Sequence, residues 1–320
     1  MDSPTVTETL PGRQDRILIV GTARSGTSWC GKVMSRAEGV RYYHEPDNVD
    51  ADTERPEVAG RRGFGPYPFV DATNEGALTP LWDAVWSGRL PRMRGWKLHA
   101  GRVALRLPRS LRDPLTRQYA SVASRLPGGP QCTVVKSIYA PFSVEWLVAR
   151  YQPRVVAIQR NPLNVVSSWR QLGMHGFDLG SREAVRERVL DRLGVAPPSP
   201  RLSALGGIAW TVGLLTTVLG ESLARHPEWL FLTHEDLCTD PPARFRSVFD
   251  CVGLNWSPRV EQFLAESNRP GEGFVEMRIA QEQPTRWRKR LTDAEVDEVA
   301  EVLGAFPQRG WLRAPAPLPA

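Results

Sequence analysis

Continuous apolar runs mark the strands that this sequence predicts. Residues 16–20, 132–136, 154–159 and 229–232 form such runs, bounded by Gly or by polar residues. Runs of this kind are typical of strands buried on both faces of a parallel sheet. The segment 39–43, which contains two tyrosines, is predicted as a further strand.

Helical segments alternate with these strands. We expect helices at about 27–37, 143–150, 162–172, 182–193, 205–224, 241–252 and 293–303. The start at 162 has a clear signal, since Asn161 can cap the helix and Pro162 suits its first position. Strands that alternate with helices predict an α/β fold, in which a central parallel sheet is flanked by helices.

One α/β domain, residues 15–312, is expected to hold these elements. A loop-rich and helical insertion is expected at about 50–130, where Pro, Gly and Arg are frequent. We expect residues 1–14 to be a disordered N-terminal tail and the Pro/Ala-rich residues 313–320 to be frayed.

Composition excludes several classes of protein. Of the 320 residues, 41% are hydrophobic and 24% are charged, which is typical of a globular domain and not of a disordered or collagen-like chain. No apolar run reaches the roughly 18 residues of a membrane span. The polar N-terminus has no secretory leader pattern, and the four cysteines have no CxxC spacing. We therefore expect a cytoplasmic protein with reduced thiols and no membrane span.

Basic residues outnumber acidic ones, which gives a formal charge of +6 and a pI near 9.4. This excess favours an anionic partner. Nucleic acid, an acidic membrane surface and a phosphorylated small molecule all qualify, and charge alone does not choose between them.

A glycine-rich loop, residues 21–28, follows the first strand. Its GxxxxG spacing and its hydroxyl residues are typical of loops whose backbone N–H groups surround phosphate oxygens at a helix N-terminus. Nucleoside triphosphatases place Lys after the second Gly, but here that position is Thr27, and the cation is Arg24 inside the loop. The loop is therefore expected to bind a phosphate without ordinary triphosphate chemistry, unless it is only a strand-to-helix turn.

A second anion site is predicted after the strand 154–159. This strand is followed by Arg160, where a triphosphatase usually offers an acidic metal ligand, and Ser168 lies eight residues further on. The carboxyl ends of parallel strands open on one edge of a sheet, so both sites suit one ligand with two separate phosphates. The alternative is a surface Arg and a solvated Ser.

The two motifs together resemble the sulfotransferases that use 3′-phosphoadenosine 5′-phosphosulfate (PAPS). The 5′-phosphosulfate loop of that family is similar to Arg24-Ser25-Gly26-Thr27-Ser28-Trp29, and its 3′-phosphate motif is similar to Arg160-Asn161-Pro162 with Ser168. Residues 233–237 with Gly253-Leu254, and the basic loop Arg286-Trp287-Arg288, also resemble the family. The resemblance covers residues 15 to 305.

This resemblance implies a P-loop-like nucleotide-binding fold, PAPS as cosubstrate and no metal. It implies transfer of a sulfuryl group to a hydroxyl or amine of a small-molecule, natural-product or glycan acceptor, with no nucleic acid as partner. The oligomeric state stays open, with a dimer as one alternative. The family members that act on phenols carry Lys-Thr-His where this chain has Lys136-Ser137-Ile138, so their His base is absent. The late loop also lacks the common Arg-Lys-Gly.

Bacterial and carbohydrate-type members use a Glu after the second strand, which makes Glu45 the expected base and His44 the alternative. Arg24 and the backbone from Ser25 to Ser28 are then expected to contact the phosphosulfate. Lys136 is expected to support the sulfuryl group, or else to form a structural ion pair. Trp29 is expected to pack under the adenine, or else in the core. Arg286 and Arg288 are expected to lie near the 3′-phosphate.

The acceptor site is left open by the sequence. Trp82, Trp86, Trp96, His99 and residues 174–178 are candidates for its lining, or they pack in the core and on the surface. The other histidines, at 175, 226 and 234, have no metal or triad spacing and are interpreted as structural or surface residues. Two other functions remain as alternatives: a P-loop small-molecule kinase, and a non-catalytic nucleotide- or RNA-binding module.

Overall fold

The computed structural model describes residue 10 and residues 12–48, 65–71, 73–90, 131–271 and 277–307. The predicted C-terminal tail and most of the predicted N-terminal tail and insertion lie outside the described residues. Trp96 and His99 lie outside them too.

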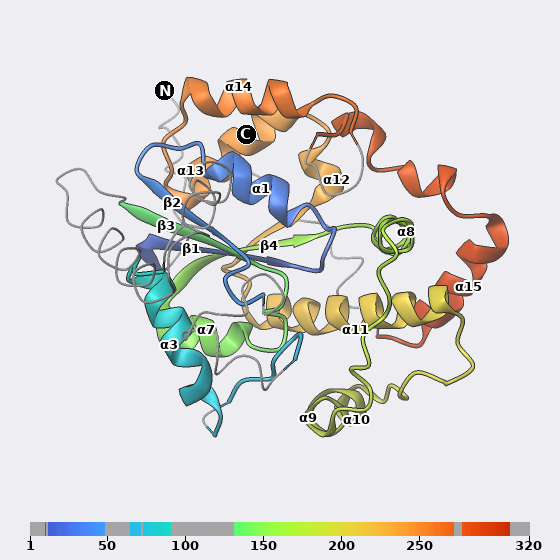
Figure 1. Cartoon of the computed structure of the whole chain (residues 1–320). Coiled ribbons are helices and arrows are strands. Elements are labelled where there is room, and N and C mark those ends of the chain that lie inside the picture. The colour runs from blue at the N-terminus through green and yellow to red at the C-terminus, as the bar shows by residue number, and fades with distance from the viewer. Residues whose placement is uncertain are drawn as a thin grey trace, which may run out of the picture.

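A five-stranded parallel sheet forms the centre of the fold, in the order β2-β3-β1-β4-β5 (Figure 1). The strands are β1 (Arg13–Gly21), β2 (Val40–His44), β3 (Cys132–Ser137), β4 (Pro153–Gln159) and β5 (Leu230–Thr233). The central strand β1 has β3 on one side and β4 on the other, so the segments that follow these three strands meet at one edge. The predicted α/β class, with a parallel sheet, is confirmed.

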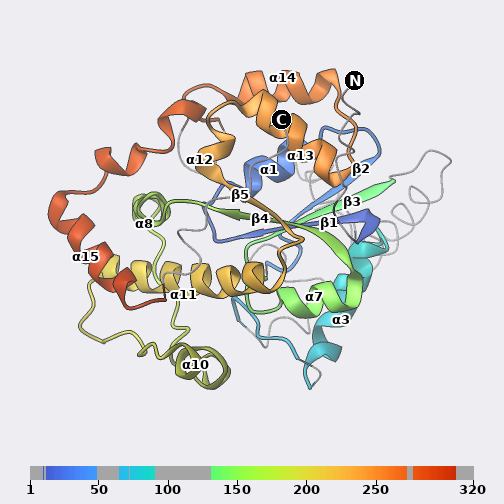
Figure 2. The ribbon, with the colours of Figure 1, turned by 180° about the vertical axis from the view of Figure 1, so that it is seen from behind.

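Helices cover both faces of the sheet, as Figures 1 and 2 show. Ile17 and Ile19 of β1 pack in one cluster with α1 (Thr27–Met34), α13 (Pro241–Val252) and α14 (Pro258–Ser267). Leu18 and Val20 point to the opposite face, because successive side chains alternate along a strand. There they pack with residues of α3 (Glu75–Trp86), α7 (Val144–Tyr151) and α11 (Ala204–Arg225). The runs that predicted the strands are apolar because both faces are covered.

The remaining elements lie at the edge where the strands end. They are α8 (Pro162–Gln171), α12 (His234–Leu237), the 3₁₀ turns Ala280–Glu282 and Arg286–Lys289, and α15 (Asp293–Gly304). The segment predicted as one helix over 182–193 consists of α9 (Glu183–Val185), a π-helical turn (Arg186–Leu190) and α10 (Asp191–Leu193). Helices α12 and α14 were not predicted.

One helix of the described chain, α11, has the length and the apolar composition that crossing a membrane would require, with a mean hydropathy of 1.3. However, 78% of that stretch is buried inside the protein, against residues such as Phe306 and Trp169. The core therefore accounts for its apolar character.

Candidate functional site

The glycine loop between β1 and α1 is held by its own hydrogen bonds and by α8. The hydroxyl of Ser25 is buried and donates to the carbonyl oxygen of Thr22 at 2.7 Å. The indole Nε1 of Trp169 on α8 donates to the carbonyl oxygen of Ala23 at 3.0 Å. The first turn of α1 contains no acidic residue. The N–H groups at the N-terminus of α1 and the positive end of the helix dipole therefore suit an anion here.

Gly26 lies where only glycine fits. Its φ is +97°, and a Cβ added there would lie 2.4 Å from Cδ2 of His234. His234 begins α12 and is buried against the underside of the loop. Burial, reinforced by the charges of Arg160 and Arg24, lowers the pKa of His234 well below its usual value. This imidazole is therefore a neutral support for the loop.

Arg160, at the end of β4, is joined to the loop. Its Nη1 donates to the carbonyl oxygen of Arg24 at 3.1 Å, and its Nη2 donates to the carbonyl oxygen of Gln283 at 3.2 Å. Arg24 in turn donates from Nε to the hydroxyl of Ser168 on α8, at 3.1 Å. Burial lowers the pKa of Arg160 to about 10, so this guanidinium is still charged at neutral pH.

A small pocket lies over these groups. Its lining residues are Arg24, Arg160, Ser168, Gln171, Leu172, Arg278, Gln283 and Arg290. Four arginines thus line one space, and none of the described residues that line it is acidic. Such a pocket is suited to an anion that carries more than one negative charge.

Arg286 and Arg288 are predicted to lie near the 3′-phosphate, and the pocket described above is lined by Arg278 and Arg290. Arg288 is exposed, and its guanidinium lies 4.6 Å from the ring centre of Trp287. Arg290 directly follows the 3₁₀ turn Arg286–Lys289. Asn164 of α8 anchors the turn, because its Nδ2 donates to the carbonyl oxygen of Pro284 (2.8 Å) and its Oδ1 accepts from the backbone N–H of Trp287 (3.1 Å).

Glu45 and Lys136 form an ion pair at the same edge of the sheet. In the β2–β3 register, His44 is opposite Lys136, and the backbone N–H of Glu45 donates to the carbonyl oxygen of Lys136 at 2.7 Å. The side chain of Lys136 is 2% exposed and that of Glu45 is 13% exposed. Burial raises the pKa of Glu45, but the ammonium of Lys136 outweighs it, so this pKa is lowered and the carboxylate is ionised.

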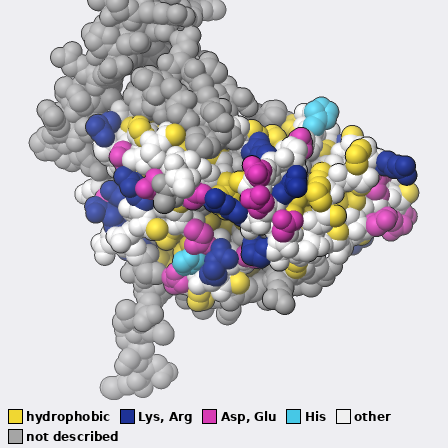
Figure 3. All heavy atoms as spheres, turned by 90° about the horizontal axis from the view of Figure 1, so that it is seen from below, with side chains coloured by type: hydrophobic (Ala, Val, Ile, Leu, Met, Phe, Trp, Pro, Cys, Tyr) yellow, Lys and Arg dark blue, Asp and Glu magenta, His cyan; other side chains and the backbone are white. Residues whose placement is uncertain are grey.

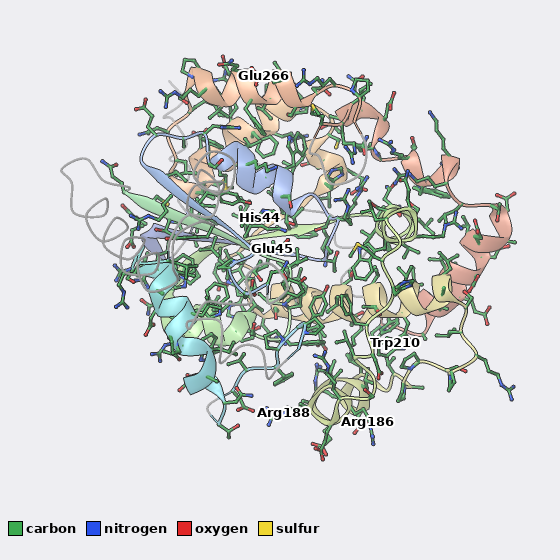
Figure 4. The ribbon with its side chains drawn as sticks, viewed as in Figure 1. His44, Glu45, Arg186, Arg188, Trp210 and Glu266 are labelled. Carbon is green, nitrogen blue, oxygen red and sulfur yellow. The ribbon has the colours of Figure 1, made fainter. Side chains whose placement is uncertain are left out.

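His44 and Glu45 both lie at the end of β2 (Figure 4). The Nε2 of His44 is 3.8 Å from Oε1 of Glu45, and its Nδ1 is 3.0 Å from the hydroxyl of Tyr42. Glu45 has a φ of +48°, a region that non-glycine residues rarely adopt. Strain of this kind clusters at functional sites.

The other predicted residues are distributed between the site and the core. Trp29 packs edge-on against Phe245 of α13, with 5.0 Å between ring centres, and is partly buried. Trp82 and Trp86 stack on each other in the core beneath the sheet. In the loop 174–178, Phe177 packs against Tyr67, whose ring is 1% exposed.

Similarity to known proteins identifies the family of this chain. Residues 14–302 match the sulfotransferase domain family. The chain belongs to this family. Carbohydrate sulfotransferase 2 of Homo sapiens is 30% identical over 176 residues, and that of Mus musculus is 29% identical. Each alignment covers 46% of this chain and 32% of the relative, so the matched region spans about a third of the length of these curated relatives.

Solved sulfotransferases resemble the chain at low identity. Sulfotransferase STF9 from Mycobacterium avium is 14% identical, with a TM-score of 0.43, over 91% of this chain and 76% of that chain. Mouse sulfotransferase SULT7A1, solved in complex with PAP, is 13% identical, with a TM-score of 0.41, over 92% of this chain and 84% of that chain.

Proposed function

We propose that this protein is a PAPS-dependent sulfotransferase that sulfates a hydroxyl group of a small-molecule or glycan acceptor. The observation that carries this proposal is that two cationic sites adjoin, the glycine loop at the N-terminus of α1 and the arginine pocket with Arg160, and that Arg24 of the loop also lines this pocket. One nucleotide with a 5′-phosphosulfate and a separate 3′-phosphate matches two such sites. The similarity to carbohydrate sulfotransferase 2 supports a sugar hydroxyl as acceptor.

PAPS binding is assigned to named groups of this chain. The backbone N–H groups of Ser25 to Ser28 and the guanidinium of Arg24 bind the 5′-phosphosulfate. Arg160, Ser168, Arg278 and Arg290 bind the 3′-phosphate. In this proposal Arg278 and Arg290 take the place of the predicted Arg286 and Arg288.

Transfer requires a base, a fixed cation and exclusion of water. Glu45 accepts the proton of the acceptor hydroxyl while the acceptor oxygen attacks sulfur. The new bond joins that oxygen to sulfur, and the bond between sulfur and the 5′-phosphate oxygen breaks. The electron pair stays on the phosphate oxygen, which yields 3′,5′-adenosine bisphosphate (PAP). Lys136 and Arg24 offset the charge that develops on the transferred group.

Glu45 and Lys136 already pair with each other in the structure, which supports these roles. The ion pair keeps the carboxylate of Glu45 ionised, and it holds the ammonium of Lys136 close to the group that is transferred. When the acceptor hydroxyl binds to Glu45, Lys136 can turn one of its three N–H donors toward the sulfuryl oxygens.

Calorimetry with PAP, ATP and single-stranded RNA, in EDTA, tests the nucleotide assignment. We expect PAP to bind tightly and ATP and RNA to bind weakly. Tight ATP binding that depends on magnesium, with none for PAP, would show a kinase instead. Incubation with [³⁵S]PAPS and a panel of glycans and phenols then tests transfer directly, because labelled product identifies the acceptor class.

A further inference from the structure

Lys136 is nearly out of contact with solvent, and two carboxylates act on it. One is Glu45, its ion-pair partner. The other is Asp47, which is 2% exposed and follows Glu45 by two residues. Both lie in the segment after β2, beside the end of β3. A buried carboxylate so close to the proposed base calls for an explanation, because burying a charge is costly unless it is compensated.

Asp47 is anchored to the residue that follows Lys136. The hydroxyl of Ser137 donates to Oδ2 of Asp47 at 2.6 Å, and the same hydroxyl oxygen accepts from the backbone N–H of Tyr139 at 3.1 Å. A hydrogen bond donated to a carboxylate favours its ionised form. The hydrogen bond from Ser137 thus favours a negative charge on Asp47, next to the strand end that carries Lys136.

We propose that Asp47 is a positioning residue that keeps Lys136 protonated during sulfuryl transfer, when Glu45 has taken the acceptor proton and has lost its own charge. The inference rests on the proposed function, since it assigns Glu45 as the base. At that moment Glu45 no longer compensates the buried ammonium. A buried charge whose partner is removed is strongly destabilised, and Lys136 would then lose its proton.

The charges around Lys136 agree with these separate roles of Glu45 and Asp47. Burial lowers the pKa of Lys136, while Glu45 and Asp47 raise it and Arg24 lowers it. His44 faces Glu45 rather than Lys136. Burial and the nearby groups, both carboxylates included, raise the pKa of Tyr67 well above its usual value, so this phenol stays neutral. Among the described protein groups that act on Lys136, Asp47 is thus the negative one that remains after Glu45 is neutralised.

Titration of Lys136 tests the proposal without any acceptor. The chain has four lysines, at 32, 97, 136 and 289, so ¹³Cε-lysine labelling gives few signals, and Lys136→Met assigns the relevant one. Glu45→Gln reproduces the neutral base. In this variant we expect Lys136 to stay protonated at neutral pH. In Glu45→Gln/Asp47→Asn we expect its titration midpoint to fall by about one pH unit or more.

Ser137→Ala in the Glu45→Gln background is the matched control, because it removes the hydrogen bond of Asp47 and leaves the carboxylate. A purely structural role predicts that Ser137→Ala and Asp47→Asn move the midpoint equally. The proposal predicts a clearly larger shift for Asp47→Asn. Equal midpoints in Glu45→Gln and in the double variant overturn it. Asp47→Ser replaces Asp47→Asn if the latter does not fold, with the same expected shift.

This experiment separates the proposal from the proposed function. The titration is read without PAPS, so a wild-type protein that transfers no sulfuryl group would refute the function and leave the titration result standing. Where transfer is measurable, the alkaline limb of turnover in Asp47→Asn is expected at lower pH than in the wild type, with unchanged affinity for PAP. An unmoved alkaline limb contradicts a role in turnover.

Discussion

Arg160 and Arg24 are directly joined, because Nη1 of Arg160 donates a hydrogen bond to the backbone carbonyl oxygen of Arg24 at 3.1 Å. The side chain of Arg24 bonds in turn to Ser168, so the loop after β1 and helix α8 form one hydrogen-bonded unit. This unit exists because β1 and β4 are neighbours in the sheet.

Replacing Arg160 is expected to weaken binding of PAP far more than binding of adenosine 5′-monophosphate, because Arg160 lines the pocket assigned to the 3′-phosphate. Loss of one charge-assisted contact corresponds to about a 10- to 100-fold weaker affinity. Calorimetry on the Arg160→Ala variant measures this loss of affinity for each nucleotide. Arg288→Ala is the matched control, since that guanidinium is exposed on Trp287, and we expect it to change affinity little. Equal losses for both nucleotides would argue against a 3′-phosphate site.

Gly26→Ala is expected to disrupt the glycine loop. The φ of +97° disfavours any side chain, and the new methyl group would collide with His234. Backbone strain alone costs on the order of 1–3 kcal/mol. We expect lower stability in urea unfolding and weaker PAP binding. Gly207→Ala in α11 is the control, since nothing lies within 4 Å of its added Cβ and alanine favours helix. A Gly26→Ala protein that binds PAP normally would contradict the assigned role of the loop.

Much of this site could be predicted from sequence because its parts follow strand ends. The apolar runs identified β1 and β4, and parallel pairing brings Arg24 and Arg160 to one edge whatever lies between them. The ion pair of Glu45 with Lys136 could not be predicted as a pair. It depends on the register of β2 against β3, two strands far apart in the chain, and no local pattern specifies that register.

The late basic loop shows why the sequence does not choose among its cations. The run 286–290 contains several cations, and which of them faces the pocket depends on the 3₁₀ turn that Asn164 anchors from α8. Such an anchor is a long-range hydrogen bond without a sequence signature. By contrast, the sequence does contain a signal for helix α14, because Pro258 begins a segment with apolar residues at 260, 263 and 264.

Glu45→Gln is expected to retain affinity for PAP and to lower turnover by about 10²- to 10⁴-fold, the usual contribution of a general base. The amide keeps the shape of the side chain but cannot accept the acceptor proton. Single-turnover transfer from [³⁵S]PAPS measures the effect. His44→Asn tests the alternative base, and we expect turnover close to that of the wild type. The reverse pattern, with loss in His44→Asn alone, would assign the base to His44.

Removing Lys136 is expected to make stability depend on pH with a definite sign. The pKa of Glu45 is lowered in the folded protein, so the pair contributes stability above the unfolded pKa of about 4.3, and this contribution is lost as pH falls through the folded pKa. Lys136→Met removes the ammonium from a largely buried carboxylate, which costs about 3–5 kcal/mol when that carboxylate is charged. Urea unfolding should show the largest loss at pH 7 and a smaller one at pH 4, where Glu45 takes a proton. The double variant Glu45→Gln/Lys136→Met should be more stable than Lys136→Met at pH 7; equal stability would contradict this account.

The face seen in Figure 3 carries basic and acidic side chains close together over its described part. Ion pairs of the described chain such as Arg188–Asp71, Arg192–Glu221 and Arg225–Glu145 account for part of the arginine excess. In these pairs the guanidinium charge is offset locally. They therefore add little to the field that attracts a nucleotide.

His226 is expected to add a second, weaker pH dependence, remote from the nucleotide site. Its Nε2 and Nδ1 each lie 2.8 Å from a carboxylate oxygen, of Glu145 and Glu228, and its ring stacks on Trp229 at 4.3 Å. Burial lowers the pKa of His226, but the two carboxylates outweigh it and raise this pKa. The added stability is therefore complete below the unfolded pKa of about 6.5 and is lost as pH rises through the folded pKa.

His226→Phe keeps the stacked ring and removes the charge. Because the ion pairs of His226 are partly solvated, this variant should lose up to about 1 kcal/mol of unfolding free energy at pH 5.5 and almost none at pH 8.5. Urea unfolding at the two pH values, repeated at high salt to screen the pair, measures the difference. A wild type and a variant whose stabilities differ by the same amount at both pH values would show that the histidine charge contributes nothing.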